Sequence, residues 1–239
     1  MNIEGSIALV TGANRGLGAA FCRSLLDQGA AKVYAAARNP DSVQMHGVVP
    51  VRLDITSDSD IAAAVAMCSD LTLLINNAGI SNATPALSLN GIDGGRAEFD
   101  TNVFGTLAMS RAFAPVLGSN GGGAMVNVLS VLSWVAMPGT AYYCASKAAA
   151  WSFTNALRLD LAAQHTQVVA LHVGLMDTDM AAGLNSPKSS PDDVAAQTLA
   201  GVAAGAFEVL ADDTSRHVRS ALSADLTAMY PGLAQSRPD

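Results

Sequence analysis

Short apolar runs alternate with segments of helical periodicity along the first part of the chain. Residues 6–11 form an apolar run that predicts a buried strand, and apolar residues then recur at three- and four-residue steps from Leu17 to Leu26 until Gly29 ends the pattern. Further apolar runs predict strands over 32–37, 48–53 and 71–75, and helical spacing predicts one further helix over 58–69. Strands that alternate with helices in this way indicate a parallel sheet covered on both faces.

The second part of the chain continues the alternation with longer helices. We expect a loop over 81–95, helices over 96–117, 141–164 and 194–206, and strands over 125–129, 168–173 and 207–211. Residues 179–190, which include Gly183 and Pro187, predict a mobile flap, and the tail after Asp213 predicts a helix followed by a disordered end. With neither repeats nor a linker, residues 1–239 predict a single α/β domain with a doubly wound parallel sheet of the Rossmann type.

A glycine-rich turn joins the first predicted strand to the first predicted helix. Its sequence is Gly12-Ala13-Asn14-Arg15-Gly16-Leu17-Gly18. Glycines permit a tight turn and let the backbone approach a pyrophosphate, whose charge is stabilised by the amide groups at the start of the helix. Because a strand precedes the turn and a helix follows it, the sequence predicts a dinucleotide site.

The end of the second predicted strand indicates which dinucleotide binds. Arg38 lies 20 positions after Gly18, where this fold places either an acidic residue for a ribose 2'-hydroxyl or an arginine for a 2'-phosphate. Arg15, inside the glycine turn, could supply a second guanidinium. The two arginines favour NADP(H), whereas Asp41 would serve a 2'-hydroxyl, and hence NAD, if the strand ended later.

A tyrosine and a lysine four positions apart predict acid–base chemistry. If residues 141–164 are helical, Tyr143 and Lys147 lie on one face. An ammonium beside a phenol favours the phenolate and lowers a pKa that is about 10 when unperturbed, so Tyr143 could transfer a proton near neutral pH. Ser130 ends the strand predicted at 125–129, 13 positions before Tyr143, and Asn102 interrupts the helix predicted at 96–117.

Together these motifs resemble the short-chain dehydrogenase/reductase family, in its single-domain branch. The resemblance covers nearly the whole chain and includes Asn76-Asn77-Ala78-Gly79 after the fourth strand. One departure is Val173, which stands where the family usually has proline. The cofactor contacts that the resemblance implies are Gly12, Asn14, Arg15, Gly16, Leu17, Gly18, Arg38, Asp54, Ile55, Asn77, Ala78, Gly79, Tyr143, Lys147, Gly174, Met176 and Thr178.

The resemblance also implies a catalytic tetrad. Asn102, Ser130, Tyr143 and Lys147 match the family's Asn-Ser-Tyr-Lys set in order and spacing. Tyr143 would be the proton donor, with Lys147 lowering its pKa and bonding the nicotinamide ribose. Ser130 would bond the substrate oxygen, and Asn102 would hold a water in a relay to solvent. Negative charge that grows on a carbonyl oxygen as it receives hydride needs such a donor and such a proton.

The predicted function is NADP(H)-dependent transfer of a hydride between nicotinamide and a small, mainly apolar ketone or secondary alcohol, as in a carbonyl reductase. Candidate pocket residues are Val131, Leu132, Trp134, Met137, Met180 and Leu184, several of which could instead be core residues. A dehydratase or epimerase of the same fold is disfavoured by the glycine spacing and by chain length. Two alternatives stay open, an NAD-dependent alcohol dehydrogenase and a catalytically silent NADP-binding redox sensor, although the chain keeps the tyrosine and lysine that silent proteins tend to lose.

Composition removes other classes of function. The net charge of −7 and pI near 4.9 argue against a nucleic-acid partner. Three widely spaced cysteines predict neither disulfides nor a metal site. With no basic leader segment and no apolar run long enough for a membrane span, we expect a cytoplasmic protein. The helix predicted at 141–164 is apolar nearly all round, which predicts that it is buried, either within the domain or against another subunit. We take this as an indication of a homo-oligomer, either a dimer or a tetramer.

Overall fold

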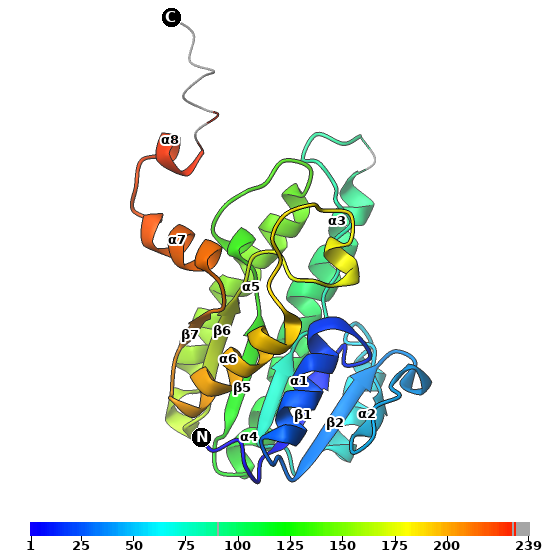
Figure 1. Cartoon of the computed structure of the whole chain (residues 1–239). Helices are drawn as coiled ribbons and strands as arrows, with labels where there is room; N and C mark the ends of the chain where they lie inside the picture. The colour runs from blue at the N-terminus through cyan, green and yellow to red at the C-terminus, as the bar shows by residue number, and fades with distance from the viewer. Residues whose placement is uncertain (90, 231, 233–239) are drawn as a thin grey trace, which may run out of the picture.

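A central sheet of seven parallel strands organises the chain (Figure 1). The computed structural model describes residues 1–89, 91–230 and 232, so the disordered end predicted for the tail lies outside the described residues. The strand order is β3-β2-β1-β4-β5-β6-β7. Strand bounds are Ile7–Thr11 (β1), Lys32–Ala37 (β2), Val49–Arg52 (β3), Leu73–Asn76 (β4), Ala124–Val128 (β5), Gln167–His172 (β6) and Glu208–Leu210 (β7).

The order of the strands reverses between β1 and β4, and this position determines where a ligand binds. Successive strands are added outward from β1 on one side and from β4 on the other. In doubly wound sheets the crevice at the carboxyl ends of the strands, at this reversal, holds the ligand. The predicted fold class is confirmed.

Helices cover both faces of the sheet, as the sequence predicts. Alternate residues of β1 enter two different cores, with Ala8 and Val10 on one face and Leu9 on the other. The first core is closed by α1 (Gly16–Asp27) and α6 (Pro191–Ala203), and the second by α2 (Asp58–Met67), α4 (Thr106–Ser119) and α5 (Ala141–Asp160). Among the described residues, no helix is both long enough and apolar enough to cross a membrane.

The predicted loop over 81–95 is wrong at its end, because a helix begins at Gly91. Helix α3 (Gly91–Phe99) runs into a π-helical turn, η2 (Asp100–Gly105), and then into α4. Glycines are poor helix formers, which is why the helix predicted from residue 96 starts five residues too late. The Tyr142 ring packs so closely on this helix that a Cβ at Gly95 would collide with it. Packing against α5 therefore overrides local propensity.

The remaining short elements lie at the ends of the strands and at the C-terminus. Helix α5 ends at Asp160, four residues before the predicted end, and the short turn η4 follows it. Helices α7 (Asp213–Ala221) and α8 (Leu226–Met229) lie beyond the β6–β7 edge (Figure 1). The short 3₁₀ turns are η1 (Pro40–Ser42), η3 (Val131–Ser133), η4 (Ala162–Gln164) and η5 (Asp179–Ala181).

Candidate active site

The glycine turn between β1 and α1 is shaped by close backbone contacts. Gly12 has a positive φ of 65°, which favours glycine. A Cβ at Gly18 would collide with the Gly12 carbonyl oxygen, and one at Gly16 would lie 3.3 Å from the Thr178 methyl. The loop after β6, which carries Thr178, therefore packs against the turn. Leu17 is buried in the core, so only its backbone can face a ligand.

The turn is tied to the end of β4 by a compact set of hydrogen bonds. The Thr11 hydroxyl accepts from the backbone N–H groups of Asn77 and Ala78, both at 3.0 Å. The Asn77 side chain donates to the carbonyls of Thr11 at 2.8 Å and Gly12 at 3.3 Å. Asn77 thus fixes the shape of the turn through its side chain, a role that the motif alone does not reveal.

The two arginines that predict a 2'-phosphate site lie on exposed segments at this crevice. Strand β2 ends at Ala37, so Arg38 follows it directly and Asp41 lies further on, in η1. Arg15 donates to Asp179 of η5 at 2.9 Å, in an ion pair whose side chains are both largely exposed. That ion pair is worth little in stability, so Arg15 can exchange Asp179 for another anion at small cost.

Asp54, a predicted adenine contact, is held by local hydrogen bonds. The backbone N–H and the hydroxyl of Thr56 donate to its carboxylate at 2.9 and 2.7 Å. These bonds lower the pKa of Asp54, and the charge of Arg38 lowers it further. The carboxylate is therefore ionised at neutral pH and lies within electrostatic range of Arg38.

Asn102 lies on the π-helical turn η2 and is pinned by both of its side-chain ends. Its Oδ1 accepts from Ile80 N at 2.9 Å, and its Nδ2 donates to Ile80 O at 2.9 Å and to Ser146 Oγ at 3.0 Å. A Cβ at Gly79 would lie 3.1 Å from Asn102 Oδ1 and 3.6 Å from Lys147 Nζ. Asn102 and Lys147 therefore border the same glycine. A π turn often marks a functional position in a helix, and this one carries Asn102.

Tyr143, Lys147 and Ser130 meet where β5 ends and α5 begins. Lys147 Nζ lies 5.7 Å from the centroid of the Tyr143 ring and donates to Val128 O at 2.9 Å. Burial raises the pKa of Tyr143 to about 12, while the neighbouring Ser130 side chain acts in the opposite direction. Burial lowers the pKa of Lys147 to about 8.

The expectation that Lys147 lowers the pKa of Tyr143 is therefore wrong for this structure. The lysine is only 5% exposed and bonds a backbone carbonyl, not the phenol. Loss of hydration then outweighs any attraction between the two groups and disfavours both charged forms. Tyr143 is protonated at neutral pH in this state, which is the form that an acid requires.

The depressed pKa of Lys147 predicts a pH dependence of stability. The pKa of Lys147 is 10.5 in the unfolded chain and about 8 in the folded protein. Between these two pH values the lysine is protonated in the unfolded chain but not in the folded protein. Stability therefore rises with pH across this window. We expect the free energy of unfolding of the wild type, minus that of Lys147→Met, to grow by on the order of 3 kcal/mol across it. Denaturant titrations at several pH values measure this, and a difference independent of pH would contradict it.

The predicted substrate residues differ widely in burial. Val131 is buried, and its N–H donates to Val173 O at 3.0 Å. The Trp134 ring stacks on His172. Leu132 is partly buried, while Met137, Met180 and Leu184 are exposed on the loop after β5 and on the flap.

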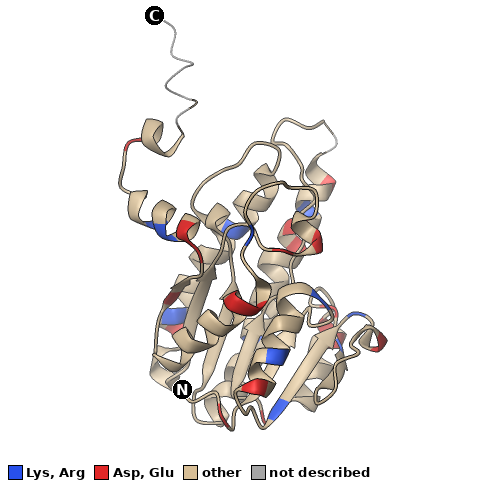
Figure 2. Ribbon diagram, viewed as in Figure 1, with Lys and Arg blue, Asp and Glu red and all other residues tan. Residues whose placement is uncertain are grey.

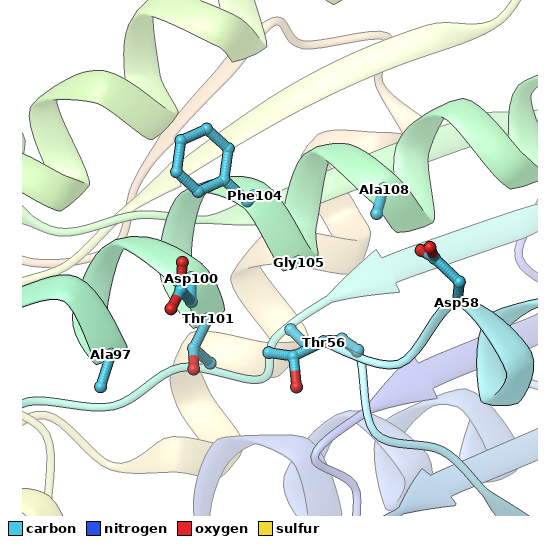
Figure 3. A pocket seen from close by; sticks show the side chains of 9 residues that line it. Thr56, Asp58, Ala97, Asp100, Thr101, Phe104, Gly105 and Ala108 are labelled. Atoms are coloured by element: carbon cyan, nitrogen blue, oxygen red, sulfur yellow. The ribbon is translucent and has the colours of Figure 1, made fainter.

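Two surface hollows border residues that the sequence predicts to contact the cofactor. A hollow of about 530 Å³ lies between the start of α2 and the α3–η2–α4 segment, and Ile55 is part of its wall (Figure 3). A second hollow of about 390 Å³ has Asn14 at its edge, beside α1 and the loop after η1. The six predicted substrate residues line neither hollow.

Backbone hydrogen bonds close the ends of the predicted flap. Asp177 N donates to Ser189 O at 3.0 Å, and Ser189 N donates to Leu175 O at 2.8 Å. Met176 and Ser189 form an isolated bridge. Gly174 N donates to Asp212 Oδ2 at 2.6 Å, which ties the loop after β6 to the start of α7. The flap lies at the same end of the sheet as α3 and the start of α5 (Figure 1).

Sequence reasoning misses two buried polar side chains beside the tetrad. Glu98 on α3 is fully buried, accepts from Asn82 N at 2.5 Å, and has its pKa raised by burial. His172 at the end of β6 is also fully buried and contacts the Ser130 carbonyl. The only signal in the sequence is a polar residue within an apolar pattern, and such a residue has no identifiable partner until the fold is known.

Comparison with known proteins defines the class of this protein. The family model described as short chain dehydrogenase matches residues 6–189. A 3-oxoacyl-[acyl-carrier-protein] reductase of Vibrio harveyi is 30% identical, covering 86% of this chain and 85% of that protein. A cis-4-hydroxycyclohexanecarboxylate dehydrogenase of Sinomonas cyclohexanicum is 32% identical, covering 74% and 76%.

A solved structure agrees over the full length. It is a short chain dehydrogenase from Burkholderia cenocepacia in complex with NADP, 42% identical, with a TM-score of 0.93 and 100% of each chain covered. The chain belongs to the short-chain dehydrogenase/reductase family and is an oxidoreductase of that family. The resemblance that the sequence motifs carry is thereby confirmed.

Proposed function

We propose that this enzyme uses NADP(H) to interconvert a small, mainly apolar ketone and its secondary alcohol. One observation carries the proposal: Ser130 lies close enough to a protonated Tyr143 to lower its pKa, at the carboxyl end of β5 and beside Lys147. A carbonyl oxygen placed there meets a hydrogen-bond donor and a proton donor together. The test is ketone-dependent oxidation of NADPH, followed with a panel of ketones of graded size and with NADH in parallel.

The residues of the chain fit the cofactor that the Burkholderia structure contains. Within the part of the chain that the structure describes, no side-chain capping hydrogen bond is made at Arg15, the N-cap of α1, so the first backbone N–H groups of that helix are left for a pyrophosphate. Arg15 and Arg38 would hold the 2'-phosphate, and Asp54 and Ile55 would border the adenine. When bound, NADPH supplies the hydride.

Each member of the tetrad would have its own role in the reaction. Tyr143 would give its phenolic proton to the substrate oxygen as negative charge develops there, and the Ser130 hydroxyl would donate a hydrogen bond to the same oxygen. Lys147 would return a proton to Tyr143 and bond the nicotinamide ribose. Asn102, held by Ile80 and Ser146, would keep a water in line between Lys147 and solvent. In reverse, the same groups remove a proton from an alcohol.

The substrate assignment rests on exposed apolar side chains near this end of the sheet. Met137, Met180 and Leu184 are 38%, 56% and 42% exposed, and burial of such surfaces by a substrate would contribute to its affinity. The Vibrio and Sinomonas relatives are named for an oxoacyl and a hydroxycyclohexane substrate respectively, and both names are compatible with a ketone and alcohol pair. Turnover that rises with the apolar bulk of the ketone would support this assignment.

Charge reversal at Arg38 tests the choice of cofactor. We expect Arg38→Asp to raise the KM for NADPH by at least about tenfold, because a charge-assisted contact to the 2'-phosphate becomes a repulsion. The KM for NADH should change far less. Arg111→Asp, the same reversal on the exposed side of α4, is the matched control. Equal effects of Arg38→Asp on both cofactors would refute the 2'-phosphate assignment and favour the NAD-dependent alternative.

A silent NADP-binding sensor is the alternative from another class. Such a protein would bind NADPH yet consume none with any ketone of the panel. Retention of both Tyr143 and Lys147 on α5 favours the enzyme, because a sensor needs no proton donor. Calorimetric binding of NADPH without turnover would reverse that preference.

We also propose a cytoplasmic homo-oligomer, either a dimer or a tetramer. Cys22, Cys68 and Cys144 are free and buried, as is usual in a reducing compartment. The π-helical turn η2 exposes Phe104, at 56%, and helix α5 exposes Phe153, at 39%. In the view of Figure 2, Lys and Arg are dispersed among separate elements, which fits a protein that binds no polyanion. We expect sedimentation analysis to give at least a dimer, and Phe104→Asp with Phe153→Asp to give a monomer. A wild-type monomer would contradict this.

A further inference from the structure

A buried histidine that the proposed catalytic steps do not use lies directly behind Ser130. His172 is 0% exposed, and its Nδ1 lies 3.1 Å from Ser130 O. Its Nε2 has no hydrogen-bond partner among the described residues. Burial lowers the pKa of His172 to about 4, so the ring is neutral under working conditions. Because a carbonyl can only accept, Nδ1 carries the proton and donates it to Ser130 O.

The His172 ring is itself held in place by a column of planar groups. Trp134, from the loop after β5, stacks on it with ring centroids 3.8 Å apart and planes at 18°. The Trp151 ring of α5 meets Trp134 edge-on at 6.2 Å. On α7, the Arg219 guanidinium lies 5.7 Å from the Trp134 ring and bonds Glu208 Oε2 at 3.1 Å. The imidazole that β6 carries is thus held by Trp134 of the loop after β5, and this ring is supported by α5, α7 and β7.

The backbone of Ser130 is bonded at both ends, and its side chain retains a free proton. Ser130 N donates to Ser133 Oγ at 3.3 Å, and Ser130 O accepts both from His172 and from Ser133 N, the latter at 3.0 Å. Ser130 Oγ accepts from Leu132 N at 3.1 Å, which leaves its hydroxyl proton to donate elsewhere. The peptide that carries the side chain sets the position of Oγ, from which the proton can rotate toward an acceptor. Further along the loop, Ala136 N donates to Tyr230 Oη at 2.9 Å, so the C-terminal helices hold the loop at a second point.

We propose that His172 is a positioning residue for Ser130, holding its carbonyl so that the serine hydroxyl points at the oxygen of the substrate. Helix α7 contributes through Arg219, which packs on the Trp134 ring, and Trp134 in turn keeps the imidazole in its plane. This inference rests on the proposed function, because it requires Ser130 to bond the substrate. A small displacement of such a donor is costly, since a shift of about 1 Å can reduce turnover by about a hundredfold.

Two substitutions of His172 distinguish the effect of its Nδ1–H donor from the effect of the volume of its side chain. His172→Asn keeps an N–H donor close to the position of Nδ1, whereas His172→Leu fills a similar volume without one. Among the described residues, Ser130 O then keeps the backbone N–H of Ser133, at 3.0 Å, as its donor. We expect His172→Leu to lower kcat about tenfold, with the KM for NADPH little changed. His172→Asn should retain most of the turnover. Equal losses in the two variants would overturn the proposal.

A double-mutant cycle with Ser130→Ala distinguishes positioning from general support of the fold. If His172 acts through the serine, His172→Leu costs little further kcat once the hydroxyl is gone. Additive losses overturn the proposal. Wild-type turnover of Ser130→Ala would overturn the proposed function itself, whereas an inactive Ser130→Ala with a fully active His172→Leu would overturn positioning alone. Should His172→Leu fail to fold, Trp134→Leu, from a partly exposed loop residue, takes its place in the cycle with the same expectation.

A spectroscopic measurement tests the hydrogen bond directly. The sequence contains four histidines, and of these only His172 is buried. In a ¹⁵N spectrum of histidine-labelled enzyme we expect one resonance set of the Nδ1–H tautomer, with no titration around neutral pH. His172 present as the Nε2–H tautomer would overturn the proposal, because Nδ1 would then have no proton to donate to Ser130 O.

Discussion

Replacement of Tyr143 by phenylalanine should lower turnover by about 10²- to 10⁴-fold, because it removes the proton donor and leaves the ring in place. Affinity for NADPH should be nearly unchanged, since the phenol is not needed to bind the nucleotide. The measurement is kcat at saturating NADPH together with a titration of NADPH binding. Loss of affinity in step with turnover would indicate a collapsed site.

Tyr142 provides a matched control in the adjacent position. Its ring packs on α3, near Gly91 and Gly95, and not beside Ser130. Tyr142→Phe removes the same hydroxyl from a residue with a structural role, so we expect turnover close to that of the wild type. Retained activity in Tyr143→Phe, with Tyr142→Phe also active, would remove Tyr143 from the mechanism.

Replacement of Gly18 by alanine should reduce NADPH affinity by at least about a hundredfold, because the new Cβ overlaps a backbone carbonyl that cannot move aside without opening the turn. A Cβ there would collide with Gly12 O and lie 2.7 Å from Asn77 Nδ2. Both atoms belong to the network that ties the turn to β4. Calorimetric titration with NADPH measures the loss.

Gly183 is the control for this substitution. It lies on the flap, and nothing comes within 4 Å of a Cβ built there. We expect Gly183→Ala to bind NADPH as the wild type does. Thermal unfolding of both variants separates lost binding from lost folding, and a Gly18→Ala variant of wild-type affinity would show that the turn does not hold the pyrophosphate.

Most of the fold follows from periodicity, because each strand and helix buries a face that its own sequence defines. The strands β1 to β7 begin and end within two residues of the predicted bounds. The first half of helix α3 escapes prediction because three of its residues, Gly91, Gly94 and Gly95, have no local preference for a helix. What stabilises it is the ring of Tyr142, distant in sequence, and no local pattern contains that information.

The sequence likewise predicts some features of the candidate site and not others. Spacing places Tyr143 and Lys147 on the same face of α5, and the structure agrees. Spacing cannot give the pKa of either group, because desolvation depends on every element packed around them. The partners of Asn77, Asn102 and His172 are likewise set by strand order, which brings together residues 22 to 66 positions apart. Motifs thus locate the chemistry, whereas the tertiary structure decides its electrostatics.

The central proposal is that hydride passes from NADPH to a ketone at the end of β5. The most direct measurement supplies NADPH deuterated at its hydride-donating carbon together with an apolar ketone, and determines the mass of the alcohol formed. We predict an alcohol that carries one deuterium with wild-type enzyme and almost no alcohol with Tyr143→Phe. NADPH that binds without forming any alcohol, or an alcohol free of deuterium, would contradict the account.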